Sequence, residues 1–336
     1  MKPTDFAYSL SRFFEHYLAG QRNTSSNTIK SYRDTFKLLL IYCQQKHNLA
    51  SHRLHLKNVD KDLVIGFLDW LEHDRKNSLS TRNQRLVGLH SFYQYMHRED
   101  PTRLLDYQHI LSIPMKKAPT ATPNYLTADA LKHLLAQPDR STVTGRRDLT
   151  LLSVLYDTGA RVQELVDLAL RDVRLDPPAI VTLTGKGRKS RQVPLMPATE
   201  SLLKQYIEET FEHRNNQLDK PLFYNRQHSR MTRAGISYIL KKYVQQARVT
   251  SNLLPDKITP HVMRHTRAML LLQAGVNLIY IRDFLGHVDI ATTEVYARAD
   301  TEMKRKALES AYPEVVDPAM PHWTKDSDLL SWLKQL

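Results

Sequence analysis

Apolar side chains recur at intervals of three and four residues through most of the sequence, and this spacing limits the possible folds more than any other feature. One example among the first hundred residues is the set Leu63, Phe67, Trp70 and Leu71. A period of 3.6 residues places such side chains on one face of a helix, which must pack against other helices. We therefore predict a mainly α protein with a four-helix domain at its N-terminal end.

A run of prolines and lysines interrupts the helical spacing after residue 98. The residues concerned are Pro101, Pro114, Lys116, Lys117, Pro119 and Pro123. Proline lacks a backbone N–H and favours extended conformations, so this composition predicts an extended basic linker. A length of 336 residues also favours two domains over one. We expect a helical domain over residues 1–98, a linker over 99–124, a second domain over 125–312 and a tail over 313–336.

One stretch of the second domain changes from helical spacing to alternation. Val181 and Leu183 alternate with polar residues, a Gly-Lys-Gly turn follows, and the chain returns over residues 192–195. A period of two is typical of β-strands, and glycine permits a tight turn. We therefore expect a small antiparallel sheet within a mostly helical domain.

The charge of the chain indicates a polyanionic partner. Lys and Arg together number 48 against 35 Asp and Glu, a net charge of +13, and both halves of the chain share the excess. Such a balance is typical of proteins that bind nucleic acid, although a merely basic soluble protein stays possible. Cys43 is the single cysteine, which excludes a disulfide within the chain and fits a reducing compartment.

No membrane attachment is expected. The first residues, MKPTDFAYSL, contain no apolar leader, and no segment approaches the apolar length that a membrane-spanning helix needs. We therefore expect a soluble, cytoplasmic protein.

Hydroxyl and amide side chains cluster before two of the N-terminal helices, in NTSSNTIK and NSLSTRNQR. These residue types cap helices, and a helix N-terminus with cations nearby binds phosphate well. The candidate nucleic-acid contacts in or next to these segments and in the linker are Arg22, Thr28, Lys30, Arg33, Arg82, Arg85, Lys116 and Lys117. The alternative is a pair of capped helices with solvated charges.

Three segments of the second domain carry residues suited to anion chemistry. In DTGARVQEL, Gly159 should end a helix in the left-handed conformation and Arg161 should begin the next. Glu164 is spaced to orient Arg161 or a nearby histidine, although an i,i+3 ion pair on the surface is the simpler explanation. In the turn GKGRK, Lys186 lies between two glycines, where it is either solvated or able to approach a backbone closely.

The segment TPHVMRHTR predicts an anion site at the start of a helix. Thr259 is a good cap and Pro260 a good first residue, which places His261 and Arg264 in the first turns. His261 and His265 also have the spacing of a zinc helix, but the glutamate of that motif is missing and Arg264 lies between them. We therefore expect no metal.

The stretch LGHVDIATTEVYAR places Gly286 and His287 at the end of one helix and Tyr296 nine residues later. Tyr296 is either an ordinary half-buried aromatic or a nucleophile. The order Arg161, Lys186, His261, Arg264, His287 and Tyr296 resembles the tyrosine recombinase (phage integrase) family, strongly over residues 125–312. Residues 4–98 are similar only in kind and position to the SAM-like core-binding domain of that family.

The resemblance implies a site-specific DNA recombinase that needs neither a cofactor nor a metal. By that resemblance, Tyr296 attacks a DNA phosphodiester and forms a 3′-phosphotyrosyl bond, with His261 as candidate base. Arg161 and Arg264 hold the phosphate, Lys186 protonates the leaving oxygen, and His287 positions the phosphate. Glu164 and His265 support these groups. Because the phosphotyrosyl bond conserves energy, no ATP is required.

The resemblance further implies a homotetramer on two DNA sites and a Holliday-junction intermediate, at the nucleoid. The tail segment DSDLLSWLKQL would expose an apolar stripe of Leu329, Leu330, Trp332, Leu333 and Leu336. We expect it to dock into a neighbouring protomer; packing on its own domain is the alternative. The biological use would be integration or excision, transposition, or dimer resolution. Two other functions stay open: relaxation of DNA like a type IB topoisomerase, and a non-catalytic DNA-binding architectural role.

Overall fold

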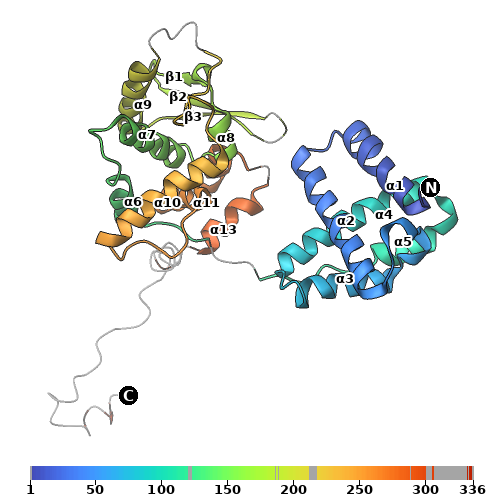
Figure 1. Cartoon of the computed structure of the whole chain (residues 1–336). Helices are drawn as coiled ribbons and strands as arrows, with labels where there is room; N and C mark the ends of the chain where they lie inside the picture. The colour runs from blue at the N-terminus through green and yellow to red at the C-terminus, as the bar shows by residue number, and fades with distance from the viewer. Residues whose placement is uncertain are drawn as a thin grey trace. The chain divides into compact units, whose positions relative to one another are not determined.

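The computed structural model describes residues 2–119, 123–185, 187, 189–211, 218–287 and 289–299, and also residues 305, 331, 333 and 334. The chain forms two compact units, Met1–Thr120 and Ala121–Leu336. Figure 1 draws both units, and each is described by itself.

The first unit is helical, as predicted from its apolar spacing. Its elements are α1 (Asp5–Arg12), a π-helix (Phe13–Gln21), α2 (Ser26–His47), α3 (Lys61–His73), α4 (Leu79–Glu99), α5 (Leu104–Leu111) and short 3₁₀ turns at Ser51–Arg53, Leu56–Asn58 and Pro101–Arg103. Their apolar faces meet in an aromatic core. The rings of Phe13, Phe36 and Phe92 lie with centroids 5.2–6.4 Å apart. Burial of these large rings supplies much of the driving force for packing.

The extended linker predicted over residues 99–124 is wrong for its first half. Residues 104–111 form α5, and Tyr107, Ile110 and Ile113 are buried in the core of the first unit. The Tyr107 hydroxyl also donates to the Asp100 carboxylate at 2.8 Å. Two turns of helix are too short to give a clear periodicity, and the prolines on either side concealed it. Proline is in fact tolerated just before a helix and just after it.

The second unit combines helices with a three-stranded antiparallel sheet in the order β1-β2-β3. Its helices are α6 (Ala128–Leu135), α7 (Val143–Asp157), α8 (Val162–Asp167), α9 (Pro197–Thr210), α10 (Arg233–Thr250), α11 (Pro260–Gln273), α12 (Leu278–Leu285) and α13 (Ala291–Ala299), with a 3₁₀ turn at Leu170–Asp172. The strands are β1 (Val173–Arg174), β2 (Ile180–Thr184) and β3 (Ser190–Pro194). The predicted mainly α fold with a small antiparallel sheet is therefore confirmed.

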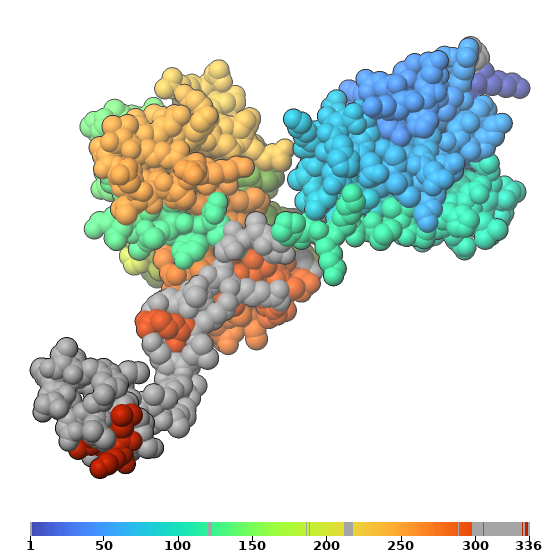
Figure 2. All heavy atoms as spheres, turned by 90° about the horizontal axis from the view of Figure 1, so that it is seen from below, coloured from blue at the N-terminus to red at the C-terminus, as the bar shows by residue number. Residues whose placement is uncertain are grey.

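The register of the hairpin β2–β3 determines which side chains face the core of the second unit. Val181 lies opposite Val193, and Leu183 lies opposite Arg191. Val181, Leu183 and Val193 are buried in a core that they share with the surrounding helices. On the face seen in Figure 2, atoms coloured green and orange adjoin, in agreement with the contact between α6 and α10.

The apolar stripe predicted for the tail lies outside the described residues, apart from Leu333, which is exposed. Among the helices that the structure describes, none is long and apolar enough to cross a membrane.

Candidate functional site

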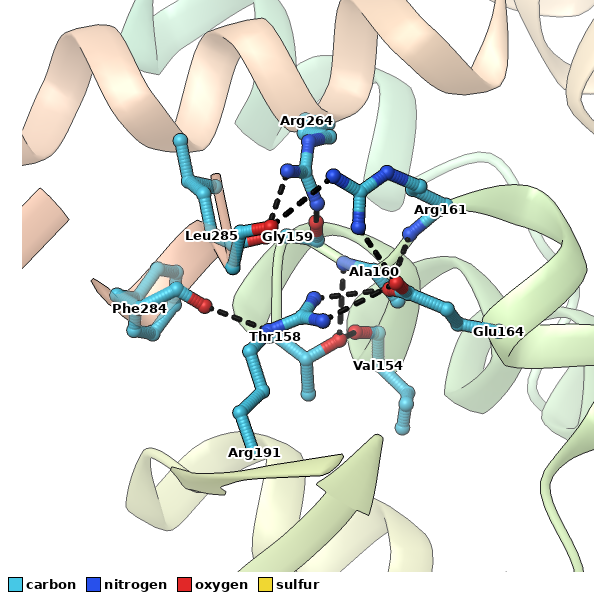
Figure 3. A network of polar contacts seen from close by, with 11 residues as sticks. Val154, Thr158, Gly159, Ala160, Arg161, Glu164, Arg191, Arg264, Phe284 and Leu285 are labelled. Carbon is cyan, nitrogen blue, oxygen red and sulfur yellow. Dashed lines mark hydrogen bonds and ion pairs between the residues drawn. The ribbon is translucent and has the colours of Figure 1, made fainter. Parts of the chain in front are cut away.

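Arg264 is the buried centre of the candidate site. Thr259 caps α11, with its hydroxyl accepting from the Val262 backbone N–H, and Pro260 is the first helical residue, as predicted. This start places Arg264 on the face of α11 toward α7 and α12. Its side chain donates to the carbonyl oxygens of Gly159 and Leu285, each at 2.6 Å, and only 2% of the residue is exposed (Figure 3).

Both carbonyls are available because two helices end beside Arg264. Gly159 has φ +56° after the end of α7, and Gly286 has φ +65° at the end of α12. These left-handed residues, which the sequence predicts, turn the chain and leave the last carbonyls without helical partners. A guanidinium is well suited to bind two such carbonyls at once.

Arg161 lies next to this arrangement at the start of α8. Its Nη1 donates to Glu164 Oε1 at 2.7 Å, and its Nη2 donates to the Gly286 carbonyl at 3.2 Å. Its backbone N–H donates to Glu164 Oε2 at 2.9 Å. Glu164 therefore orients Arg161, one of the two roles expected for it, and its burial excludes the simpler surface ion pair.

Arg191 completes the network and was not predicted. Its guanidinium binds both oxygens of Glu164, at 3.1 and 2.8 Å, and its Nε donates to the Phe284 carbonyl at 2.8 Å. One signal could have found it. Arg191 faces the same side of β3 as the buried Val193, and a charge at a core-facing position of a strand needs a buried partner.

Tyr296 on α13 is buried, with 2% of the residue exposed, in a hydrophobic cluster that includes Met269, Ile281 and Leu285. Its hydroxyl forms a hydrogen bond of 2.8 Å with Nδ1 of His265. The candidate base of the sequence analysis, His261, instead stacks on His265 with ring centroids 5.9 Å apart. His261 and His265 lie one turn apart on α11, and the packing of α13 against that helix brings the second to the phenol.

His287 follows the end of α12 and lies close to the phenol ring. Its ring stacks on that of Tyr296 with centroids 6.4 Å apart, and its Nδ1 forms a hydrogen bond of 2.9 Å with the Thr293 hydroxyl. Thr293 is fully buried and was not predicted as part of the site.

Burial and positive charge control the ionisation of these groups. Burial, followed by the charge of Arg264, lowers the pKa of His287 to about 4, and burial and the neighbouring His261 do the same for His265. Burial raises the pKa of the Tyr296 hydroxyl, although Arg264 and Arg161 oppose it. Desolvation, then Arg264 and Arg161, lower the pKa of His261. At neutral pH the site therefore contains neutral imidazoles, a neutral phenol and charged guanidiniums.

Lys186, between β2 and β3, lies outside the described residues. The described residues contain no group of three or more His, Cys, Asp or Glu side chains that could hold a metal ion.

The helices α2 and α4 carry most of the candidate DNA contacts of the first unit near their N-termini. Gln84 donates to the Ser31 hydroxyl at 3.2 Å, and Arg85 donates to the Ser31 carbonyl at 3.0 Å. These contacts, and the close approach of Gly88 to Thr35 one turn further along both helices, show that α2 and α4 run parallel, with their N-termini at the same end. Arg22, Lys30, Arg33 and Lys117 are exposed, and Thr28 is partly exposed.

Arg82 does not fit its predicted role as a DNA contact. It is 4% exposed, and its Nη1 donates to the Pro114 carbonyl at 3.4 Å. It therefore joins α4 to the segment after α5. The Lys116 ammonium forms an ion pair with the Glu72 carboxylate at 2.7 Å, and Nη1 of Arg85 donates to the Ser31 carbonyl. Cations at a helix start can thus serve the fold as well as a ligand.

Comparison with known proteins identifies the family. The family model described as "Phage integrase family" matches residues 124–303, and the model "Phage integrase, N-terminal SAM-like domain" matches residues 11–100. The chain is 37% identical over 336 residues to the integrase/recombinase named y4rC of Sinorhizobium fredii, covering 100% of this chain and 99% of that one. This chain belongs to the phage integrase family of tyrosine recombinases.

Other relatives and solved structures agree. Tyrosine recombinase XerD of Listeria innocua is 30% identical over 90% of this chain and 96% of its own length. The crystal structure of the XerH recombinase bound to its difH substrate is similar with a TM-score of 0.66 at 25% identity, covering 90% of this chain and 84% of that one. The Tn1549 transposon integrase shares the fold, with a TM-score of 0.69 at 17% identity over 92% and 100% of the two chains.

Glu164 should make the recombinase sensitive to acid. Burial raises the pKa of its carboxyl, but hydrogen bonds and charge from Arg191, and then Arg161, outweigh that effect and lower it from 4.5 to about 2. Since the folded pKa is depressed, the stabilisation is fully present above pH 4.5 and is lost as the pH falls toward 2. It amounts to about 3 kcal/mol.

We expect the difference in melting temperature between the wild type and Glu164→Gln to shrink as the pH falls from 4.5 to 2, measured by thermal unfolding. Asp283→Asn is the control, because Asp283 is an exposed partner of Arg282 and surface pairs contribute little. A constant difference between the wild type and Glu164→Gln over this range would contradict the buried ion network.

Proposed function

We propose that this recombinase cuts and rejoins DNA strands through a covalent bond between DNA and Tyr296. One observation carries the proposal. The guanidiniums of Arg161 and Arg264 both bind carbonyls at the C-terminal end of α12, and the phenol of Tyr296 on α13 stacks on His287 at the same end. Such a cluster can bind the charged oxygens of a phosphodiester, with a nucleophile next to the bound phosphate.

The proposed reaction exchanges one phosphate ester for another. The Tyr296 oxygen attacks phosphorus, the bond from phosphorus to the 5′ oxygen breaks, and the phenolic proton leaves. The product is a 3′-phosphotyrosyl bond and a free 5′-hydroxyl, whose proton we assign to Lys186. Arg161 and Arg264 stabilise the charge of the pentavalent transition state, for which a single arginine can contribute about 10³–10⁵ in rate. The reverse attack by a 5′-hydroxyl rejoins the strand without ATP.

The phenolic proton has two candidate acceptors. The family resemblance suggests His261, whereas the hydrogen bond of 2.8 Å favours His265. With a pKa of about 4, His265 is a weak base in the protein alone. A bound phosphate would raise the pKa of both imidazoles, because an opposite charge favours the protonated form. Since Tyr296 is also buried, we propose that the α13 segment shifts when DNA binds, which frees the hydroxyl.

DNA contact by the first unit is supported by the common end of α2 and α4. The exposed side chains Arg22, Lys30 and Arg33 accompany two helix N-termini there, which together favour phosphate oxygens. We propose that this end binds the DNA backbone. The protein would then act at the nucleoid.

The proposed function is tested by trapping the covalent intermediate. A recombination site is first selected as genomic fragments that the protein binds, and is then prepared as a duplex with a nick close to the cleavage position. Cleavage releases a short strand, which prevents rejoining. We expect a complex that survives denaturing detergent, with a nucleotide attached to the peptide that contains Tyr296 by mass spectrometry. Cleavage without any covalent complex would refute the proposal.

We further propose that strand exchange occurs in a homotetramer on two paired sites, through a Holliday junction, for integration or excision, transposition or dimer resolution. The tail, residues 313–336, would link the protomers by docking in trans. A chain ending at residue 320 should then bind a single site normally and fail to pair two sites in a sedimentation assay. Unchanged pairing and recombination would contradict the role of the tail.

A further inference from the structure

Arg191 joins the segments that hold the two arginines of the site. Two of its nitrogens bind Glu164 on α8, and the third donates to the last turn of α12 at Phe284. The same carboxylate holds Arg161, and the next two carbonyls of the chain, those of Leu285 and Gly286, accept from Arg264 and Arg161. Figure 3 shows Arg191 reaching from β3 to this carboxylate and to Phe284.

Arg191 and Glu164 are packed closely against two glycines. A Cβ atom added to Gly286 would lie 3.0 Å from its Nη1, and one added to Gly185 would lie 2.9 Å from Glu164 Oε1. A side chain at Gly185 would therefore shift the Glu164 carboxylate, and one at Gly286 would press on the Arg191 guanidinium and strain a backbone with φ +65°. The Arg191 side chain is 12% exposed and that of Glu164 is 3% exposed, so a change at either is transmitted to the other instead of being absorbed by solvent.

The Glu164 carboxylate links the two arginines directly. Glu164 Oε1 accepts from both guanidiniums. Without Arg191, the carboxylate would keep, of the contacts described above, only those with the backbone N–H and the guanidinium of Arg161 itself, and nothing would tie that pair to β3. Arginine presents two parallel donors in a rigid plane, which lysine cannot do, so the fork itself fixes the orientation of the carboxylate.

We propose that Arg191 is a positioning residue for DNA cleavage, which holds Glu164 and the end of α12 so that the Arg161 guanidinium is aimed at the scissile phosphate. This inference rests on the proposed function. It requires no contact between Arg191 and the DNA. A displacement of about 1 Å in a catalytic group can cost 10²-fold in rate, and we expect a loss of that order for Arg191→Lys, which keeps the charge but removes the fork.

A matched control separates positioning from general stability. The Arg147 side chain is also mostly buried, 14% exposed, and it binds a buried carboxylate, Asp148, and a carbonyl, that of Tyr224. It lies ten residues before the end of α7, about 15 Å along that helix. Arg147→Lys should lower the melting temperature as Arg191→Lys does and leave the cleavage rate within about twofold of the wild type.

The decisive experiment replaces one charged oxygen of the scissile phosphate by a methyl group in the nicked duplex. This methylphosphonate carries one negative charge less, so it depends less on Arg161. Single-turnover formation of the covalent complex is measured on both duplexes for the wild type, Arg161→Ala, Arg191→Lys and Arg147→Lys. We expect the defects of Arg161→Ala and Arg191→Lys, each relative to the wild type, to become at least tenfold smaller on the methylphosphonate.

The possible outcomes are distinguishable. Equal defects of Arg191→Lys on both duplexes, or a defect no larger than that of Arg147→Lys, overturn the positioning role while the proposed function stands. No covalent complex with the wild type on the phosphodiester overturns both. If Arg191→Lys unfolds, Glu164→Gln, which keeps the shape and weakens the same fork, gives the same comparison, and a defect that is not relieved on the methylphosphonate overturns the role.

Discussion

The Tyr296→Phe protein should bind DNA normally and form no covalent complex with it. Loss of an attacking nucleophile removes the reaction path, and comparable losses in other enzymes approach 10⁶-fold. The phenylalanine ring keeps its place in the hydrophobic cluster with Met269, Ile281 and Leu285. Only the hydrogen bond to His265 disappears, at a cost of about 1 kcal/mol. Detergent-resistant complex on the nicked duplex and melting temperature are the two measurements.

Tyr280→Phe is the matched control for this prediction. Tyr280 lies on α12 in the same unit and is 71% exposed, so the same loss of a hydroxyl there should change neither cleavage nor stability. A covalent complex that persists in Tyr296→Phe would move the nucleophile to another residue. Loss of DNA binding in that variant would instead give the tyrosine a structural role.

The second large effect is expected for Arg264. Arg264→Ala should slow cleavage by at least about 10³-fold, because the transition-state charge loses a buried guanidinium. It also leaves the carbonyls of Gly159 and Leu285 without their partner. Two such groups cost about 2–4 kcal/mol, which lowers the melting temperature of a unit of this size by roughly 5–15 °C.

Arg264→Lys separates catalysis from stability. A lysine keeps the charge and can donate to at least one of the two carbonyls, so part of the melting temperature should return. Cleavage should stay at least about 10²-fold slow, since an ammonium cannot present two parallel donors to a phosphate. Single-turnover rates and thermal unfolding measure the two effects. A lysine variant that cleaves at the wild-type rate would show that charge alone is sufficient.

Much of the site could be predicted because its signals are local. Thr259 and Pro260 mark the start of α11, and the glycines at 159 and 286 end α7 and α12 in the left-handed conformation. These features depend on a few neighbouring residues, so the sequence alone indicates where Arg161, Arg264 and His287 lie along their elements. The order of the motifs then indicated the family.

Features that depend on distant contacts could not be predicted in the same way. Arg191 gains its role only when β3 meets α8 and α12. The choice between His261 and His265 depends on how α13 packs, because both rings lie on one side of α11. Arg82 was expected at a phosphate and is buried against Pro114 instead, since nothing local distinguishes a cation that binds a ligand from one that joins two segments.

The last turn of α12 has one more consequence. The carbonyls of residues 284–286 accept from Arg161, Arg191 and Arg264, and Glu164 is the carboxylate that pairs with the first two of these cations. A helix C-terminus supplies only about half a negative charge, so the three guanidiniums repel one another. Burial, and then the charges of Arg161 and Arg191, lower the pKa of Arg264 to about 10. Three guanidiniums less one carboxylate and this half charge leave a surplus of about +1.5. That surplus is close to the two negative charges of the pentavalent transition state in the proposed reaction. The fold would therefore hold, before any DNA binds, much of the counter-charge that the proposed reaction requires.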